Sequence, residues 1–207
     1  MNMNMPRIIF AALTVFVAST TIYGFSVTQE PEAVSAATTQ PAVTATQSEP
    51  TTPHVTLSFD FASENPNTGD QFAVWVENDR GQLINQVFVT KFATTLEGKK
   101  DLDTLPLWAG KIRNHTSQQI VDATAGATPK SGPVQYFWNL TNLKGQTVRD
   151  GEYTIYMSAT EKRTHQLNWK GTVIVKDGKA TIASQPTIMP KSATKTDMIS
   201  NLTLTAK

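Results

Sequence analysis

The 207-residue sequence contains no cysteine. This absence excludes disulfide bonds, c-type haem attachment and cysteine-ligated iron–sulfur clusters. An exported protein of this kind must draw its stability from its core, and if it carries electrons, a flavin is one of the few carriers that remain. The formal net charge is only +1, which gives no electrostatic footprint for nucleic acid.

Several patterns of catalytic residues are also absent. The chain has no Gly-x-Ser-x-Gly elbow of a serine hydrolase, and no Gly-x-Gly-x-x-Gly segment or phosphate loop. The histidines His54, His115 and His165 do not share a spacing typical of metal ligands. The sequence therefore nominates no catalytic residue and no metal site, and it favours an electron carrier or a binding module over an enzyme.

The N-terminal quarter of the chain differs in composition from the rest. Residues 8–25 follow Arg7 and are uncharged and largely apolar, which is typical of a signal peptide or an uncleaved membrane anchor. This stretch is near the short end of the about 17–25 residues that a spanning helix needs, so we expect export with cleavage. We assign residues 1–28 to this segment, and residues 29–53, rich in Thr, Ala and Pro, to a disordered linker and tether.

The remaining residues show the period-2 alternation of strands. Apolar residues alternate over 55–61 and 72–77, and in the second segment Trp75 falls on the opposite face from Phe72, Val74 and Val76. A turn at 78–81 joins this segment to 83–92 as a hairpin. Further strands are expected at 134–140, 152–159, 169–176 and 180–183, with a two-residue turn at Asp177-Gly178 and one short helix within 102–113.

Many short strands separated by turns predict an all-β, immunoglobulin-like antiparallel β-sandwich. We place this domain at residues 54–185 and leave residues 186–207 as either a tail or a last strand. Phe59, Val74, Trp138 and Tyr153 are expected to face the space between the two sheets.

The segment from Asp122 to Thr128 reads Asp-x-x-x-Gly-Ala-Thr and resembles the motif on which a bacterial flavin transferase esterifies FMN to a threonine hydroxyl. Ala125 stands where that motif has Ser or Thr. The resemblance implies that Thr128 supplies the ester oxygen, that Asp122 shapes the loop for the transferase, and that Gly126 and Ala127 keep the approach open. An ordinary polar loop explains the same residues.

Trp108 precedes this segment and lies outside a clear strand. Two interpretations remain open for its side chain. It stacks on a flat ring such as an isoalloxazine, or it closes one end of the sandwich as a packing residue.

From residue 72 to about residue 175 the chain resembles the bacterial family "domain of unknown function 2271", described as predicted periplasmic proteins. The residues that carry the resemblance are 73–77 with Gly81, Leu107-Trp108, 121–128, Tyr136-Phe137-Trp138-Asn139, the block Gly145-x-x-Val148-x-x-Gly151-x-Tyr153, and 161–165. The resemblance implies a periplasmic location or one on the outer face of the cytoplasmic membrane. It also implies flavin transferases and membrane electron-transfer proteins as partners.

Residues 138–155 also resemble the immunoglobulin-like cap of flagellar hook-assembly scaffold proteins, in which Trp-Asp-Gly precedes a Gly, Val, Gly and Tyr pattern. Trp138-Asn139-Leu140 lacks that Asp and Gly. The shared residues are those that one corner of a sandwich needs, so this resemblance supports the fold.

Two functions follow from the sequence. The first is a redox carrier with FMN esterified to Thr128. The second is a cofactor-free binding or scaffold module that uses an edge strand or a loop end of the sandwich. The colour and mass of the purified protein distinguish the two.

Overall fold

The computed structural model describes residues 48–63, 70–94, 104–115, 118–161, 165–190, 192 and 198–207. The expected signal segment (1–28) and most of the expected linker lie outside these residues. The described residues all belong to one compact unit. Within these ranges, no helix has both the length and the apolar character needed to cross a membrane.

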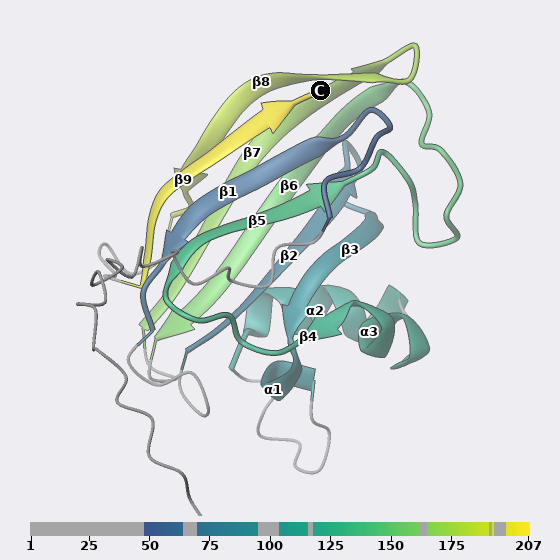
Figure 1. Cartoon of the computed structure of the whole chain (residues 1–207). Helices are drawn as coiled ribbons and strands as arrows, with labels where there is room; N and C mark the ends of the chain where they lie inside the picture. Colours follow the sequence, from purple (N-terminus) through teal and green to yellow (C-terminus); the bar gives the residue numbers. More distant parts are fainter. Residues whose placement is uncertain are drawn as a thin grey trace, which may run out of the picture. The chain divides into compact units, whose positions relative to one another are not determined.

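The described strands form two sheets that pack as a sandwich (Figure 1). The three-stranded sheet has the order β5-β1-β9, and its strands are β1 (Val55–Phe61), β5 (Gly132–Trp138) and β9 (Ile199–Ala206). The six-stranded sheet has the order β4-β3-β2-β6-β7-β8. Its strands are β2 (Gln71–Asn78), β3 (Leu83–Thr90), β4 (Ala125–Gly126), β6 (Gly151–Glu161), β7 (His165–Lys176) and β8 (Lys179–Ile188).

The antiparallel sandwich predicted from the alternating sequence is confirmed. Strands β2 and β3 form the expected hairpin, and Asp177 and Gly178 turn between β7 and β8 with φ values of 51° and 72°, as a type I′ turn requires. Strand β9 pairs with β1, and β8 continues to Ile188. The sandwich therefore includes residues beyond 185, and the C-terminal residues 199–206 form a last strand.

The space between the sheets is filled mainly by aromatic and aliphatic side chains. Phe59, Val74, Trp138 and Tyr153 are all buried there, as predicted. An aromatic group occupies the centre, where the rings of Phe88 and Tyr136 stack with centroids 4.3 Å apart. Stacked and edge-to-face rings of this kind stabilise a core beyond the area they bury.

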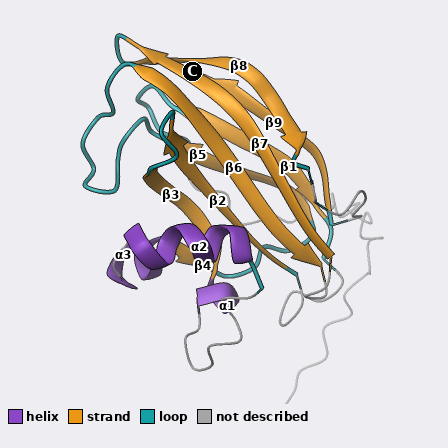
Figure 2. Ribbon diagram, turned by 180° about the vertical axis from the view of Figure 1, so that it is seen from behind, coloured by secondary structure: helices purple, strands orange, loops and turns teal. Residues whose placement is uncertain are grey.

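Three helices cover part of the outer face of the six-stranded sheet, over β2 and β3 (Figure 2). They are α1 (Lys91–Thr94), α2 (Pro106–His115) and α3 (Gln118–Thr124). Their apolar residues form a second cluster with the outward side chains of β2 and β3; its buried members are Ala73, Trp75, Val89, Ala93, Leu105, Trp108, Ala109, Ile112 and Val121. Strand β2 is therefore buried on both faces, which explains why Trp75 points away from Phe72 and Val74 yet is fully buried.

Local sequence accounts for part of this helical layer. Helix α2, which overlaps the helix expected within 102–113, begins at Pro106, where proline fits because the first helical N–H has no intrahelical partner. The expectation that 122–128 is a loop is wrong for most of the segment, because 122–124 end α3 and 125–126 form β4.

One carboxylate is buried beneath the helices. Glu77 accepts a hydrogen bond from the indole Nε1 of Trp75 at 2.8 Å and forms an ion pair with Lys111 of α2 at 3.0 Å. The ring of Tyr156 stacks on Trp75 with centroids 5.3 Å apart. Because a buried charge is costly without partners, these contacts fix α2 over the sheet.

Candidate functional site

The candidate acceptor segment begins in α3 and continues into an edge strand. Strand β4 pairs in parallel with the end of β3, with Ala125 opposite Val89 and Gly126 opposite Thr90. Only two residues pair, and the chain then continues through 127–131 to β5 in the other sheet. Thr128 therefore lies just beyond the edge of the six-stranded sheet, where the chain crosses to the three-stranded sheet.

The two threonines of the segment have different environments. Thr124 ends α3, donates to the carbonyl oxygen of Ile120 at 3.1 Å and accepts a hydrogen bond from Nε2 of Gln86. The Thr128 side chain is partly exposed, and no hydrogen bond joins its hydroxyl to another described residue. Of the two hydroxyls, the one on Thr128 makes no hydrogen bond to a described residue, whereas the one on Thr124 is engaged in holding the helix.

The remaining motif residues are also placed near this edge. Asp122 and Ala127 are exposed, and Gly126 is partly buried. A Cβ atom on Gly126 would lie 2.5 Å from Cε2 of Phe88. Packing against the core therefore favours glycine at position 126. Open access to Thr128 is not the only reason for a glycine here.

Trp108 lies in the helical layer and not beside Thr128 as a free ring. Its side chain is 1% exposed, and its Nε1 donates to Oε1 of Gln86 at 3.3 Å. The packing interpretation of Trp108 matches this burial, since neither face of the indole is open to a flavin.

Gln86 is a residue that the sequence did not single out. Its buried amide accepts from Trp108 on α2 and donates to Thr124 on α3. It therefore ties both helices to β3, next to the point where the acceptor segment begins. In a mainly apolar strand such as β3, a buried glutamine is the signal that marks such a role.

A second feature lies at the other end of β3, where two turns repeat one design. Residues 78–82 and 142–146 both read Asn-x-Arg/Lys-Gly-Gln. In each turn the asparagine Oδ1 accepts backbone N–H groups two and four residues ahead, at 3.1 and 2.9 Å for Asn78 and at 2.9 and 3.1 Å for Asn142. Gly81 and Gly145 have φ values of 70° and 73°, which favour glycine.

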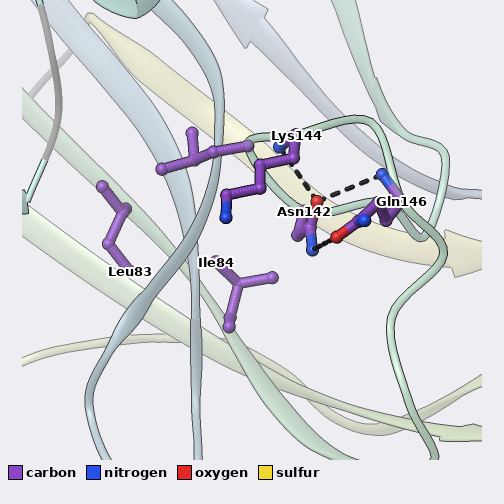
Figure 3. A pocket seen from close by; sticks show the side chains of 6 residues that line it. Leu83, Ile84, Asn142, Lys144 and Gln146 are labelled. Atoms are coloured by element: carbon purple, nitrogen blue, oxygen red, sulfur yellow. Dashed lines mark hydrogen bonds between the residues drawn. The ribbon is translucent and has the colours of Figure 1, made fainter.

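Two adjacent hollows lie beside these turns. One, of about 260 Å³, is lined by Leu83, Ile84, Asn142, Leu143, Lys144 and Gln146 (Figure 3). The other, of about 320 Å³, shares Ile84, Asn142 and Gln146 and is also lined by Asn78, Thr147, Val148, Arg149 and Tyr153. Because Ile84 lies near the start of β3 and β4 pairs with its end, the hollows and Thr128 lie at opposite ends of this strand.

A family model described as "Predicted periplasmic protein (DUF2271)" matches residues 52–187. The match runs from just before β1 nearly to the end of β8 and includes the whole acceptor segment. Searches of curated proteins and of solved structures gave no match to the chain.

Proposed function

The chain belongs to the DUF2271 family of predicted periplasmic proteins, and we propose that it is a periplasmic redox carrier with FMN esterified to Thr128. The observation that carries this proposal is the partly exposed Thr128 hydroxyl, which follows an edge strand in an Asp-x-x-x-Gly-Ala-Thr segment. The engaged hydroxyl of Thr124 supports Thr128 as the attachment point within the segment.

The attachment step requires FAD as co-reactant and a flavin transferase as catalyst. Oγ1 of Thr128 forms a new bond to the flavin-side phosphorus and loses its proton. The pyrophosphate bond of FAD breaks and AMP leaves, so the chain gains the mass of FMN less one water. When bound, the flavin supplies reversible electron transfer, while the protein supplies attachment and position.

The chain's own residues prepare the acceptor for this partner. The pairing of β4 with β3 fixes Ala125 and Gly126, and Gln86 holds the end of α3 through Thr124. Asp122 is exposed in the last turn of α3 and is proposed to contact the transferase. Membrane electron-transfer proteins are the proposed redox partners, and the N-terminal segment is the proposed tether to the outer face of the membrane.

Labelling in cells tests the proposal. The parent and variants are co-expressed with a flavin transferase in a host that supplies FAD outside the cytoplasm, and flavin fluorescence is read after denaturing electrophoresis. Thr128→Ala should abolish the label and Thr124→Ala should retain it. Thr147→Ala, at an exposed threonine beside the turns, is the control and should be labelled like the parent.

The hollows beside the two turns favour one second candidate, a cofactor-free binding module that uses the loop end of the sandwich. The same assay separates the two functions. A parent protein that stays colourless and unlabelled beside an active transferase would contradict the flavin carrier and leave the binding module.

A further inference from the structure

Strands β2, β6 and β7 carry buried polar atoms that lack hydrogen-bond partners within the described part of the chain. Gln71 and Thr160 are both 0% exposed. Among the described residues, neither Oε1 nor Nε2 of Gln71 has a hydrogen-bond partner, and the same holds for the Thr160 hydroxyl and for Oδ1 of Asn168. The Asn168 side chain is partly exposed, and its Nδ2 lies 3.5 Å from Oγ of Ser192. Gln71 alternates with Phe72 of the sandwich core, so it belongs to the outer face, along with Ala73 and Trp75 beneath the helices.

The three side chains, which we call the polar cluster, are neighbours in the sheet. Gln71 is directly opposite Thr160, and Asn168 is opposite Ser158, two residues from Thr160. Directly opposite Cβ atoms lie about 5 Å apart, and diagonal neighbours about 7–8 Å apart. Four unpartnered polar atoms therefore lie within one small area of a single sheet face.

Without a ligand, such a cluster lowers the stability of the folded protein. Each buried polar group without a partner costs about 1–3 kcal/mol, and native proteins keep few of them. A ligand that offers both donors and acceptors would remove this cost. None of the three side chains is ionisable, so the polar cluster offers hydrogen bonds but no charge to pair with a ligand.

The arrangement of donors and acceptors narrows the ligand class. The Gln71 amide presents an acceptor beside a donor, which matches the adjacent N–H and C=O of a cyclic imide through two parallel hydrogen bonds. The Thr160 hydroxyl can donate to a second carbonyl. We propose that the polar cluster binds the imide edge of a planar heterocycle, and that this heterocycle is the isoalloxazine of the FMN on Thr128; this identity rests on the proposed function.

The position of the polar cluster agrees with attachment at Thr128. Gly126 pairs with Thr90 of β3. The Thr90 hydroxyl in turn accepts a hydrogen bond from the backbone N–H of Phe72, the residue that follows Gln71 in β2. Two strand spacings, or about 10 Å, separate β4 from β2, a distance that a ribityl phosphate chain spans. Because Gln71 and Thr160 are fully buried, binding of the ring requires local opening of the fold and should therefore be slow.

Free riboflavin, which needs neither transferase nor ester, tests the polar cluster separately from attachment. The protein is made without transferase as the Thr128→Ala variant, incubated for hours with riboflavin, and followed by thermal shift and by quenching of riboflavin fluorescence. Riboflavin should raise the melting temperature. N3-methylriboflavin, which lacks the imide N–H, should not.

Two near-isosteric variants complete the test. In the Thr128→Ala background, Gln71→Met and Thr160→Val should each weaken riboflavin binding about tenfold, the ratio that about 1.4 kcal/mol produces. Both should melt no lower than their parent without ligand, because each removes unpartnered polar atoms. Thr154→Val, on the same face of β6, is the control and should bind normally.

The proposal is overturned if riboflavin causes no shift, or if N3-methylriboflavin or both variants bind as the parent does. Failure of riboflavin together with less stable variants would indicate that ordered water satisfies the polar cluster. Neither result depends on whether Thr128 is labelled in cells, so this test and that of the proposed function fail independently.

Discussion

Gly126 of β4 packs against the ring of Phe88 so closely that a Cβ atom at position 126 would lie 2.5 Å from Cε2 of Phe88. Phe88 in turn belongs to the aromatic centre of the sandwich core. The acceptor segment is thereby joined to the core through a glycine, and its position depends on that contact.

Gly126→Ala should therefore destabilise the fold, because the Phe88 ring must shift. Overpacking of this kind costs about 1–3 kcal/mol, which urea denaturation would measure. Gly110→Ala is the matched control: no described atom lies within 4 Å of a Cβ there, and alanine in a helix gains roughly 0.5–1 kcal/mol over glycine. A Gly126→Ala variant as stable as the parent would show that open access alone explains this glycine.

Gln185 joins the edges of the two sheets. Its Nε2 donates to the carbonyl oxygen of Leu204 at 2.9 Å, and its Oε1 accepts from the Leu204 N–H at 2.8 Å. The side-chain amide thus replaces a backbone pair between β8 and β9.

Gln185→Leu should leave both backbone groups of Leu204 without partners, at a cost of about 1–3 kcal/mol. Hydrogen exchange at the Leu204 amide should accelerate accordingly. The control is Gln135→Leu, at an exposed position of β5. Unchanged exchange at Leu204 in the Gln185 variant would contradict the bridging role.

Trp138 is a main element of the core. Its indole is 2% exposed, packs against Tyr153 with centroids 5.3 Å apart, and donates to the carbonyl oxygen of Thr141 at 2.9 Å. Trp138→Ala should cost about 3–5 kcal/mol, a large part of the about 5–15 kcal/mol that stabilises a domain. Thermal melting should show a sharply lower midpoint or no soluble protein, and a melt like that of the parent would argue against this core.

Stability should also fall in alkaline solution. Burial raises the pKa of the Tyr136 phenol above its ordinary value, so the unfolded chain releases this proton near pH 10 while the folded protein keeps it. The unfolded state then binds fewer protons, and stability is lost as pH rises above about 10, by up to about 1.4 kcal/mol per pH unit for this group.

Urea denaturation between pH 8 and pH 11 would measure this loss. Tyr136→Phe should have a shallower alkaline slope than the parent. Burial also raises the pKa of Tyr153 and Tyr156, with nearby carboxylates adding to the effect, so some slope should remain. Equal slopes in the parent and the variant would exclude Tyr136 as a source of the effect.

Period-2 alternation made most of the sandwich predictable. It placed Trp75 on the face opposite Phe72 and Val74, and the Asp177-Gly178 pair located the turn between β7 and β8. The position of a proline agrees with the topology as well. Pro133 lies in β5, which is an edge strand, and proline is tolerated at a sheet edge because no backbone N–H is needed on the open side.

Helix α3 was not predictable, because seven residues with few apolar members show no helical period. Its stability comes from tertiary contacts, in which Val121 packs in the helical layer and Thr124 binds Gln86. The burial of Trp108 within that layer likewise depends on neighbours that are distant in sequence, as does the absence of partners for Gln71 and Thr160 among the described residues. The acceptor motif could be read from the sequence, whereas the contrast between Thr124 and Thr128 required the fold.

The most direct test of the account is peptide mass spectrometry of the chain purified after co-expression with a flavin transferase and periplasmic FAD. We predict that the peptide containing residues 122–128 gains the mass of FMN less one water, and that fragmentation places this mass on Thr128. Unmodified mass in this peptide, under conditions in which the transferase labels a known substrate, would contradict it. The same mass placed on Thr124 would move the attachment point and contradict the role assigned to Thr128.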